Sequence, residues 1–478
     1  MDDPLDGTLT DAVDLLQSQR LSSRELTEAS LTRIAERDGI LRAWEQVHVD
    51  DALEQADQAD RRLTTSAIEQ SGPPHPLCGI PIGLKDVIAI KDKPLTAGSR
   101  ALYDNVPAQD ADVVQRLRTT GAVLLGHTRS QEFAAGRSPQ TAANPWNPAY
   151  SPGGSSNGSG AAVGGRTVLV ALGTDTAGSI RRPASACGLS TVMGTYGSVS
   201  NEGIISTGTN FTQIGPLTTT ALDAALVFSS LAKAEVYDPH TPDAGISRTL
   251  RDGTIVPTSS RRPLEGRRIG VLTDFSADVA PSIGDLFQTL LEDLVALGAE
   301  LLEIASPMAC PPNLYPVPEL IAFHRELFPA RGHLYSPHQR ELVADSLERA
   351  GTLTAVALHD AMVDRATYSR AWADRFETSE LDAVVCPSQV AETPALGEDP
   401  EHHNDLAGFG PADVRQMWNV AGFPVVGVQM GLTSRRGLPV GAQLIGRPWT
   451  EHVLLQLAVD LQHHTAHHQL RPTLDAAG

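Results

Sequence analysis

A lysine inside an apolar stretch is the first feature of this sequence that could do chemistry. Residues 79–90 read GIPIGLKDVIAI, a strand-like run that contains Lys85. Burial lowers the pKa of a lysine because the charged form loses its hydration, and a neutral amine can act as a base. An ion pair between Lys85 and Asp86, or another carboxylate, would explain the same residue without chemistry. The residues alone leave both interpretations open.

A serine at the end of a second apolar run could serve as a nucleophile. Residues 173–183 read GTDTAGSIRRP and follow the strand-like segment 168–172, so Ser179 lies at a turn where a helix could begin. The backbone N–H groups that precede it can be free, as an oxyanion hole requires. The turn carries no G-x-S-x-G motif, and no histidine has a context that assigns it to a Ser-His-Asp triad. An ordinary α/β-hydrolase is therefore not favoured.

A glycine- and serine-rich loop lies between these two elements. Residues 151–160 read SPGGSSNGSG, and glycines of this kind let backbone amides approach a bound group closely. A phosphate-binding loop is not favoured, because the G-K-[ST] ending and the G-x-G-x-x-G spacing are both missing. A flexible linker is not expected between two apolar strands.

The elements that must position these residues alternate between helical and strand-like patterns. Residues 1–70 look helical, with a capping box at Ser22 and Glu25, and SGPPHP at 71–76 breaks the pattern. The segment 267–304 reads as strand, helix, strand, which indicates a βαβ unit. The sum is an α/β fold with a mixed, largely buried sheet. Further expected elements are a helix at 112–121, strands at 123–126, 168–172, 383–386, 424–428 and 439–445, an irregular loop at 139–160, a surface excursion at 247–263 and a final helix from about 451.

Composition excludes several classes of protein. The 478 residues carry a formal net charge of −20, which repels nucleic acid and anionic membranes, so neither is an expected partner. The N-terminus lacks the features of a signal peptide, and no run of about 18 apolar residues is present. The four scattered cysteines predict reduced, mostly buried thiols rather than disulfides or a zinc site. We therefore expect a cytoplasmic protein.

Taken together, the three chemical elements resemble the amidase signature family. The corresponding segments read GIPIGLKD at 79–86, GGSSNGS at 153–159 and GTDTAGSIRRP at 173–183. Similar stretches include TAGSRAL at 96–102, WNVAGFPVV at 418–426 and GLPVGAQLIGRP at 437–448. The resemblance covers residues 8–468 and implies a single amidase-signature domain. In that fold a large mixed sheet has helices on both faces, and we expect residues 1–70 to pack as a helical segment on a domain of residues 71–478.

The resemblance also implies a Ser-Ser-Lys triad. Lys85 would be the base, Ser155 the relay, preceded by a cis peptide bond, and Ser179 the nucleophile that forms an acyl-enzyme. No metal or cofactor is implied. The implied oxyanion hole consists of the N–H groups of Thr176, Ala177, Gly178 and Ser179, and Ser156, Asp175 and Arg181 are expected as structural residues near the site.

The sequence departs from the family pattern at four positions near these motifs. Asn157 replaces a glycine, and Ala177 replaces the first glycine of Gly-Gly-Ser. Alanine keeps its N–H but tolerates a positive φ poorly, so this replacement could change the turn. Met193 and Gly194 stand where the family often has Lys-Pro, which removes a charge near the site and suggests a divergent substrate.

The expected function is hydrolysis of a carboxamide of small or medium size. Three alternatives remain open: the glutaminase subunit of a tRNA-dependent amidotransferase, an acyltransferase, and an inactive binding protein. The glutaminase alternative is disfavoured, because no counterpart of the characteristic C-terminal glutamine-binding stretch is evident. Homodimers are common in the family, so the resemblance also admits a homodimer.

Two further groups of residues could contribute to a site. The run HHTAHH at 463–468 could bind a metal from a helix, although a solvated terminal helix is the favoured interpretation. Aromatic residues in the variable segments could form the walls of the substrate pocket. They are Trp146, Phe211, Tyr315, Phe323, Phe409 and Trp418.

Overall fold

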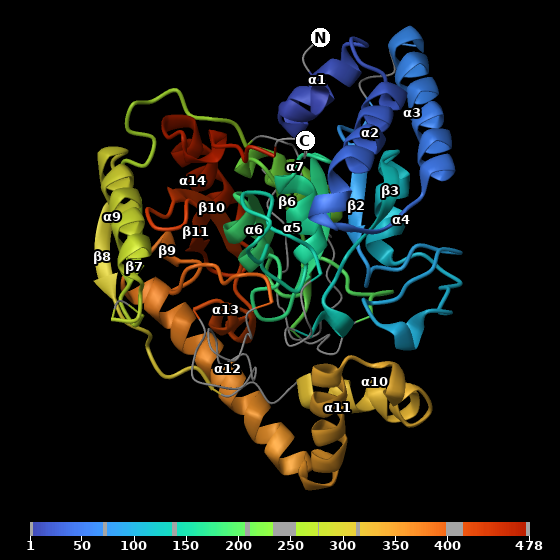
Figure 1. Cartoon of the computed structure of the whole chain (residues 1–478). Coiled ribbons are helices and arrows are strands. Elements are labelled where there is room, and N and C mark those ends of the chain that lie inside the picture. The colour runs from blue at the N-terminus through green and yellow to red at the C-terminus, as the bar shows by residue number, and fades with distance from the viewer. Residues whose placement is uncertain are drawn as a thin grey trace.

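A single mixed sheet of eleven strands forms the centre of the molecule (Figure 1). Its strand order is β1-β3-β2-β4-β6-β5-β10-β11-β9-β7-β8. The computed structural model describes residues 3–69, 74–135, 141–205, 211–232, 255–275, 277–311, 316–397 and 414–474. The strands are β1 (Trp44–Val47), β2 (Pro81–Lys85), β3 (Val123–Thr128), β4 (Val170–Asp175), β5 (Ser190–Met193), β6 (Gln213–Thr218), β7 (Arg268–Leu272), β8 (Glu300–Ile304), β9 (Ala383–Pro387), β10 (Val425–Leu432) and β11 (Pro439–Ile445).

Helices cover both faces of this sheet, as the resemblance implies. Successive side chains of a strand point to opposite faces, and here they enter two separate hydrophobic cores. On β4, Val170 and Leu172 belong to one core and Ala171 to the other. The helices are α1 (Leu9–Gln17), α2 (Ser23–Leu41), α3 (Val49–Glu69), α4 (Asp112–Thr120), α5 (Asn157–Gly164), α6 (Arg181–Cys187), α7 (Ala221–Leu231), α9 (Pro281–Ala296), α10 (Pro316–Arg331), α11 (Pro337–Arg349), α12 (Ala355–Thr378), α13 (Gln416–Ala421) and α14 (Glu451–His464).

Three strands at the N-terminal side of the sheet position the chemical motifs. β2 pairs in parallel with both β3 and β4, so the carboxyl ends of these strands meet at one edge of the sheet. Lys85 is the last residue of β2, and Asp175 is the last residue of β4. Helix α5 packs on all three strands, and α6 packs against α5 and β11. The lysine motif and the serine motif therefore come together because their strands are parallel neighbours.

The N-terminal residues contribute more than helices to this architecture. Strand β1 pairs with β3 and forms one edge of the sheet, which the sequence analysis did not predict. Leu9, Leu26 and Leu63 are buried in the same core as β2 and β4. The capping box at Ser22 and Glu25 is present at the start of α2, as expected.

Most of the other expected elements are confirmed, and several boundaries are corrected. The helix at 112–121, the βαβ unit at 267–304 and the strands expected at 123–126, 168–172, 383–386 and 439–445 are present. The strand-like run at 79–90 ends at Lys85, and the loop at 139–160 gives way to α5 at Asn157. The excursion at 247–263 is described only from residue 255 onward, where it has neither helix nor strand.

The run HHTAHH does not form one helix. Helix α14 ends at His464, and His467 begins a separate 3-10 helix. The described residues contain no group of three or more side chains able to hold a metal ion. They also include no helix that is long and apolar enough to cross a membrane.

Candidate active site

The side chain of Lys85 is fully buried and makes two hydrogen bonds to hydroxyl groups. Its Nζ lies 2.8 Å from Ser155 Oγ and 2.8 Å from Thr174 Oγ1. Burial lowers the pKa of Lys85 from its ordinary value to about 7, although the Asp175 carboxylate opposes this shift. A large fraction of Lys85 is therefore neutral near pH 7, as a general base must be.

Asp86 is not the partner of this lysine. Its carboxylate accepts hydrogen bonds from the backbone N–H groups of Thr96, at 3.1 Å, and Gly98, at 3.2 Å. Within the described part of the chain, Lys85 takes part in no ion pair with a carboxylate. The ion-pair interpretation that the sequence left open is therefore wrong. Lys85 is instead a buried amine that contacts two hydroxyl groups.

The backbone around Ser155 joins three segments of the site. The peptide bond between Gly154 and Ser155 is cis. The carbonyl of Ser155 accepts a hydrogen bond from the N–H of Gln131 at 3.1 Å, and the N–H of Ser156 donates to the carbonyl of Ser179 at 3.1 Å. The glycine- and serine-rich loop is thus attached both to the loop after β3 and to the serine turn after β4.

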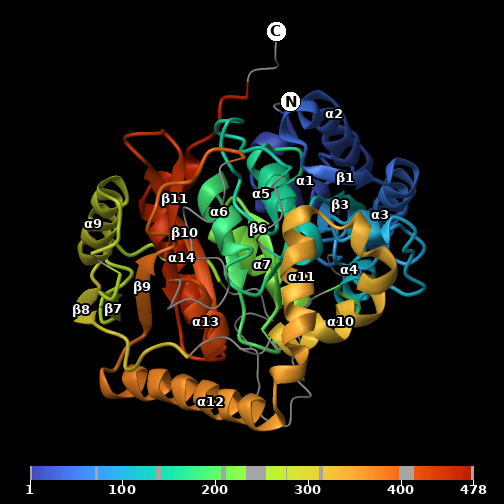
Figure 2. The ribbon, with the colours of Figure 1, turned by 60° about the horizontal axis from the view of Figure 1, so that its bottom comes forward.

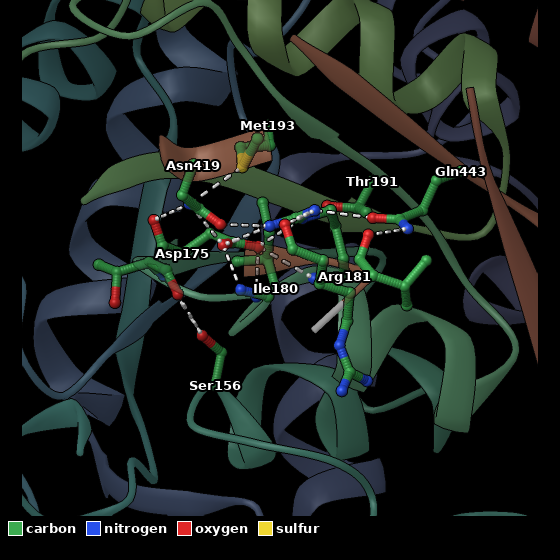
Figure 3. A network of polar contacts seen from close by, with 12 residues as sticks. Ser156, Asp175, Ile180, Arg181, Thr191, Met193, Asn419 and Gln443 are labelled. Carbon is green, nitrogen blue, oxygen red and sulfur yellow. Dashed lines mark hydrogen bonds and ion pairs between the residues drawn. The ribbon is translucent and has the colours of Figure 1, made fainter. Parts of the chain in front are cut away.

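The side chain of Ser156 makes two hydrogen bonds to the backbone of β4. Its Oγ donates to the carbonyl of Thr174 and accepts from the N–H of the same residue, both at 3.2 Å (Figure 3). The side chain therefore closes the gap between the start of α5 and the end of β4, next to Lys85.

Ser179 lies half-buried between β4 and α6, and α6 begins two residues after it. Its hydroxyl makes no hydrogen bond within the described residues. The structure therefore joins Lys85 and Ser155 by a direct side-chain contact, and it brings Ser179 to them through the backbone hydrogen bond with Ser156. Catalytic hydrogen bonds often tighten only once a substrate is bound.

The turn before Ser179 offers three N–H groups to a ligand rather than four. The N–H of Gly178 already donates to Asp175 Oδ1 at 2.7 Å, whereas those of Thr176, Ala177 and Ser179 donate no hydrogen bond within the described residues. Gly178 has a φ of +100°, which a residue with a side chain rarely adopts.

Ala177 does not distort this turn. Its φ is not positive, so its methyl group carries no backbone penalty. The side chain of Thr176, one residue earlier, is fixed by a 2.7 Å hydrogen bond to the hydroxyl of Thr212.

A fully buried ion pair between Arg181 and Asp175 holds the two ends of the turn together (Figure 3). Arg181 Nε lies 3.0 Å from Asp175 Oδ2, and Asn419 Nδ2 donates to Asp175 Oδ1 at 3.0 Å. Burial would raise the pKa of Asp175, but Arg181 and the hydrogen bonds from Asn419 and Gly178 outweigh it and hold that pKa well below its usual range. Arg181 also donates to Gln443 Oε1 at 2.7 Å. These contacts favour a structural role for Arg181 over a clamp on the substrate.

Met193 lies at the edge of this network. It is fully buried on β5, and its sulfur accepts a 3.3 Å hydrogen bond from Asn419 Nδ2. A neutral side chain therefore occupies the position where the family pattern often has lysine. Within the described residues, Arg181 is the cation that pairs with Asp175.

Sequence reasoning missed residues that only the fold brings to the site. Thr174 contacts Lys85 from a neighbouring strand, and Gln131 and Asn419 come from loops or helices distant in sequence. The one signal in the sequence for any of these residues was that Thr174 lies within the GTDTAGS motif.

The aromatic residues expected to form the walls of the substrate pocket lie in different surroundings. Tyr315 and Phe409 lie outside the described residues. Trp418 is fully buried against Trp372, with ring centroids 4.8 Å apart, and therefore belongs to the core. Phe323 packs against Phe133, which follows Gln131 by two residues.

Comparison with known proteins places the chain in a family. The family model described as Amidase matches residues 25–455, and the chain belongs to this family, whose members carry the amidase signature. It is therefore an enzyme of the class that acts on amide C–N bonds, and the fold agrees with this assignment.

Relatives with different names share nearly its whole length. A glutamyl-tRNA(Gln) amidotransferase subunit of Chloroflexus aurantiacus is 34% identical over 98% of both chains. The putative amidase AmiD of Mycobacterium tuberculosis is 32% identical over 97% of this chain and 95% of the relative. The solved structure of the native peptide amidase from Stenotrophomonas maltophilia superposes with a TM-score of 0.76 at 27% identity, over 98% of each chain.

Proposed function

We propose that this enzyme hydrolyses a carboxamide of small or medium size through an acyl intermediate on Ser179. The observation that carries the proposal is the 2.8 Å hydrogen bond between Lys85 Nζ and Ser155 Oγ in a fully buried setting. An amine with a pKa near 7 can take up and return a proton at neutral pH, as acid–base catalysis requires.

The three side chains account for the proton movements of such a reaction. Ser155 passes a proton to the neutral amine of Lys85 while its own oxygen takes the proton of Ser179. The oxygen of Ser179 then attacks the carbonyl carbon, and the negative charge develops next to the free N–H groups of the turn. The protons return through Ser155 to the leaving nitrogen, so the C–N bond breaks and the acyl-serine remains.

Water completes the cycle by the same route. It loses a proton to Ser155 and Lys85 as it attacks the acyl group, and Ser179 regains its proton when the carboxylic acid leaves. An added amine or hydroxyl compound could replace water at this step. Product analysis with such nucleophiles therefore distinguishes hydrolysis from acyl transfer.

Labelling with a fluorophosphonate probe tests the proposal without knowledge of the substrate. We expect the wild type to be labelled on Ser179 and the variant Ser179→Ala to remain unlabelled, as seen by intact mass and peptide mapping. A screen of amide substrates follows. An unlabelled wild type, folded by circular dichroism, would favour the inactive binding protein instead.

A second candidate function rests on the amidotransferase relatives. Their identity of about a third over nearly the full chain favours a glutaminase that works with partner proteins. Release of ammonia from glutamine, measured with and without the other proteins of an amidotransferase complex, tests this candidate. Hydrolysis of other amides by the isolated chain, with no response to those partners, would set it aside.

A further inference from the structure

The loop at 130–134 supports the backbone of Ser155 from outside the glycine- and serine-rich motif. Besides the hydrogen bond from Gln131 to Ser155, the N–H of Phe133 donates to the carbonyl of Ala97 at 2.7 Å. The contact with the loop around Gly98 is close, because a Cβ on Gly98 would lie 2.5 Å from the carbonyl oxygen of Ser130. A shift of loop 130–134 would therefore move the N–H of Gln131, which is hydrogen bonded to the carbonyl of Ser155.

This loop adopts a conformation that its residues do not favour by themselves. Phe133 and Ala134 have φ values of +53° and +57°, in the left-handed region that residues other than glycine avoid. Two such residues in succession persist only where the surroundings hold them. The surroundings of Phe133 therefore decide whether the loop keeps its shape.

An aromatic cage from the α10–α11 pair, defined as residues 316–349, surrounds the fully buried ring of Phe133. The ring centroids of His324 and Tyr335 lie 4.7 and 4.9 Å from that of Phe133, and that of Phe323 lies 5.8 Å away. The hydroxyl of Tyr335 is hydrogen bonded to His324 Nδ1 at 2.8 Å, which fixes two walls of the cage to each other. Aromatic pairs at these separations attract one another beyond their burial.

Polar contacts attach the α10–α11 pair to the same region. The buried carboxylate of Glu132 accepts hydrogen bonds from Ser99 Oγ at 2.6 Å and from the N–H of Ser336 at 3.1 Å, at the start of α11. Arg331 donates to the carbonyl of Ala101 at 2.8 Å. When the lower side of Figure 1 is brought forward, α10 and α11 lie in front of the rest of the chain and α12 runs along its lower edge (Figure 2).

We propose that Phe133 is a positioning residue of the catalytic centre, through which the docked α10–α11 pair holds the backbone of Ser155 in place. The inference rests on the proposed function, because it assigns Phe133 a part in the reactivity of Ser179. Phe133 does not act on Lys85 or Ser179 directly. It acts through the hydrogen bond between Gln131 and Ser155.

Leucine substitutions on the two sides of the contact test this role. Phe133→Leu and Phe323→Leu should each slow fluorophosphonate labelling of Ser179 by about tenfold, because small misplacements of reacting groups are costly. The matched control is Phe328→Leu, which removes a ring that packs on Tyr335. It should label at the wild-type rate. The double variant Phe133→Leu, Phe323→Leu should be no slower than Phe133→Leu alone, because the contact between these two rings is already lost in Phe133→Leu.

Hydrogen exchange gives a readout that does not depend on reactivity. The peptide containing the amide of Gln131 should exchange about tenfold faster in Phe133→Leu and unchanged in Phe328→Leu, each checked for an intact fold by its melting temperature. If Phe133→Leu does not fold, Phe323→Leu carries both measurements.

Three outcomes would overturn the proposal. One is a wild-type labelling rate in folded Phe133→Leu and Phe323→Leu. Another is equal slowing by Phe328→Leu, which would indicate general loosening. The third is slow labelling with unchanged exchange at Gln131. A wild type that is not labelled at all would remove the proposed function and this role together.

Discussion

At the scale of single residues, the site depends on how a buried amine is solvated. Lys85 has exchanged water for two hydroxyl groups, and each of them accepts an N–H from its Nζ. Two neutral acceptors replace only part of the hydration that an ammonium group needs, so the uncharged form gains. A lysine in these surroundings therefore suits the proposed role of general base, for which many hydrolases use histidine.

The pH dependence of labelling should follow from this shift. In the proposed mechanism the reactive form of Lys85 is the neutral amine, so the labelling rate of Ser179 should be low at acidic pH and rise to a plateau with an apparent pKa of about 7. The measurement is the labelling rate across the pH range on either side of this value. A rate that continues to rise toward the ordinary pKa of lysine would contradict the assignment of Lys85 as the base.

Removing one of the two hydroxyls should change both rate and pKa. In Thr174→Val the amine loses an acceptor that favours its charged form, so the apparent pKa should fall below that of the wild type. The plateau rate should fall about tenfold, because Lys85 loses one of the contacts that orient it. Thr174→Ser keeps the hydroxyl and should retain most of the rate. A Thr174→Ser variant as slow as Thr174→Val would show that the methyl group matters instead.

At the scale of elements, the start of α6 is secured by the ion pair between Asp175 and Arg181. Asp175 accepts the N–H groups of Gly178 and Ile180, at 2.7 and 3.2 Å, and so closes the turn that leads to the helix. The turn and the helix therefore depend on one buried carboxylate and its guanidinium partner.

Loss of the guanidinium should destabilise the protein strongly. Arg181→Met leaves Asp175 charged and buried without its cation, at a cost of about 3–5 kcal/mol in the free energy of unfolding. Chemical denaturation of the variant and of the double variant Asp175→Asn, Arg181→Met measures this. The double variant should regain part of the loss, because it buries no unpaired charge. An equal loss in both would indicate that the packing of Arg181, rather than its charge, is what matters.

Elements were more predictable from sequence than the contacts between them. Periodic apolar patterns predicted the helix at 112–121 and the βαβ unit correctly, because such patterns reflect which side of each element is buried. Strand β1, WEQV, was missed because it is short, lies between two long helices and has only one buried residue. The motifs pointed to Lys85, Ser155 and Ser179 as candidates, and the fold brings their segments together. The cage around Phe133, in contrast, joins residues about 200 positions apart and leaves no local pattern.

At the scale of the whole molecule, the N-terminal residues are part of the same sheet and core as the site. Asp223 on α7 is fully buried and accepts hydrogen bonds from the N–H groups of Leu9, at 3.2 Å, and Thr10, at 2.9 Å, at the start of α1. Trp44 on β1 donates from its indole to Thr167 Oγ1 at 3.1 Å. Contacts of this kind join the first 70 residues to the remainder.

Deletion of residues 1–70 should therefore abolish folding rather than release a smaller enzyme. The truncated chain would expose the β3 edge and the part of the core that packs against the N-terminal helices. The full chain should show one cooperative unfolding transition by calorimetry, and the truncated chain none. A folded truncated chain that labels on Ser179 would contradict this and would define 71–478 as an independent domain.

The buried sulfur of Met193 should make the network around Asp175 sensitive to oxidation. Oxidation would insert an oxygen atom between Met193 and Asn419 in fully packed surroundings, so it should abolish labelling of Ser179. Met308 and Met362 are 38% and 53% exposed and should be oxidised first without loss of labelling. Peptide mass mapping during peroxide treatment should show inactivation that tracks Met193 alone, and Met193→Leu should resist it. Peroxide can reach the buried sulfur of Met193 only when the surrounding structure opens. The inactivation rate therefore measures how often the core around Asp175 opens.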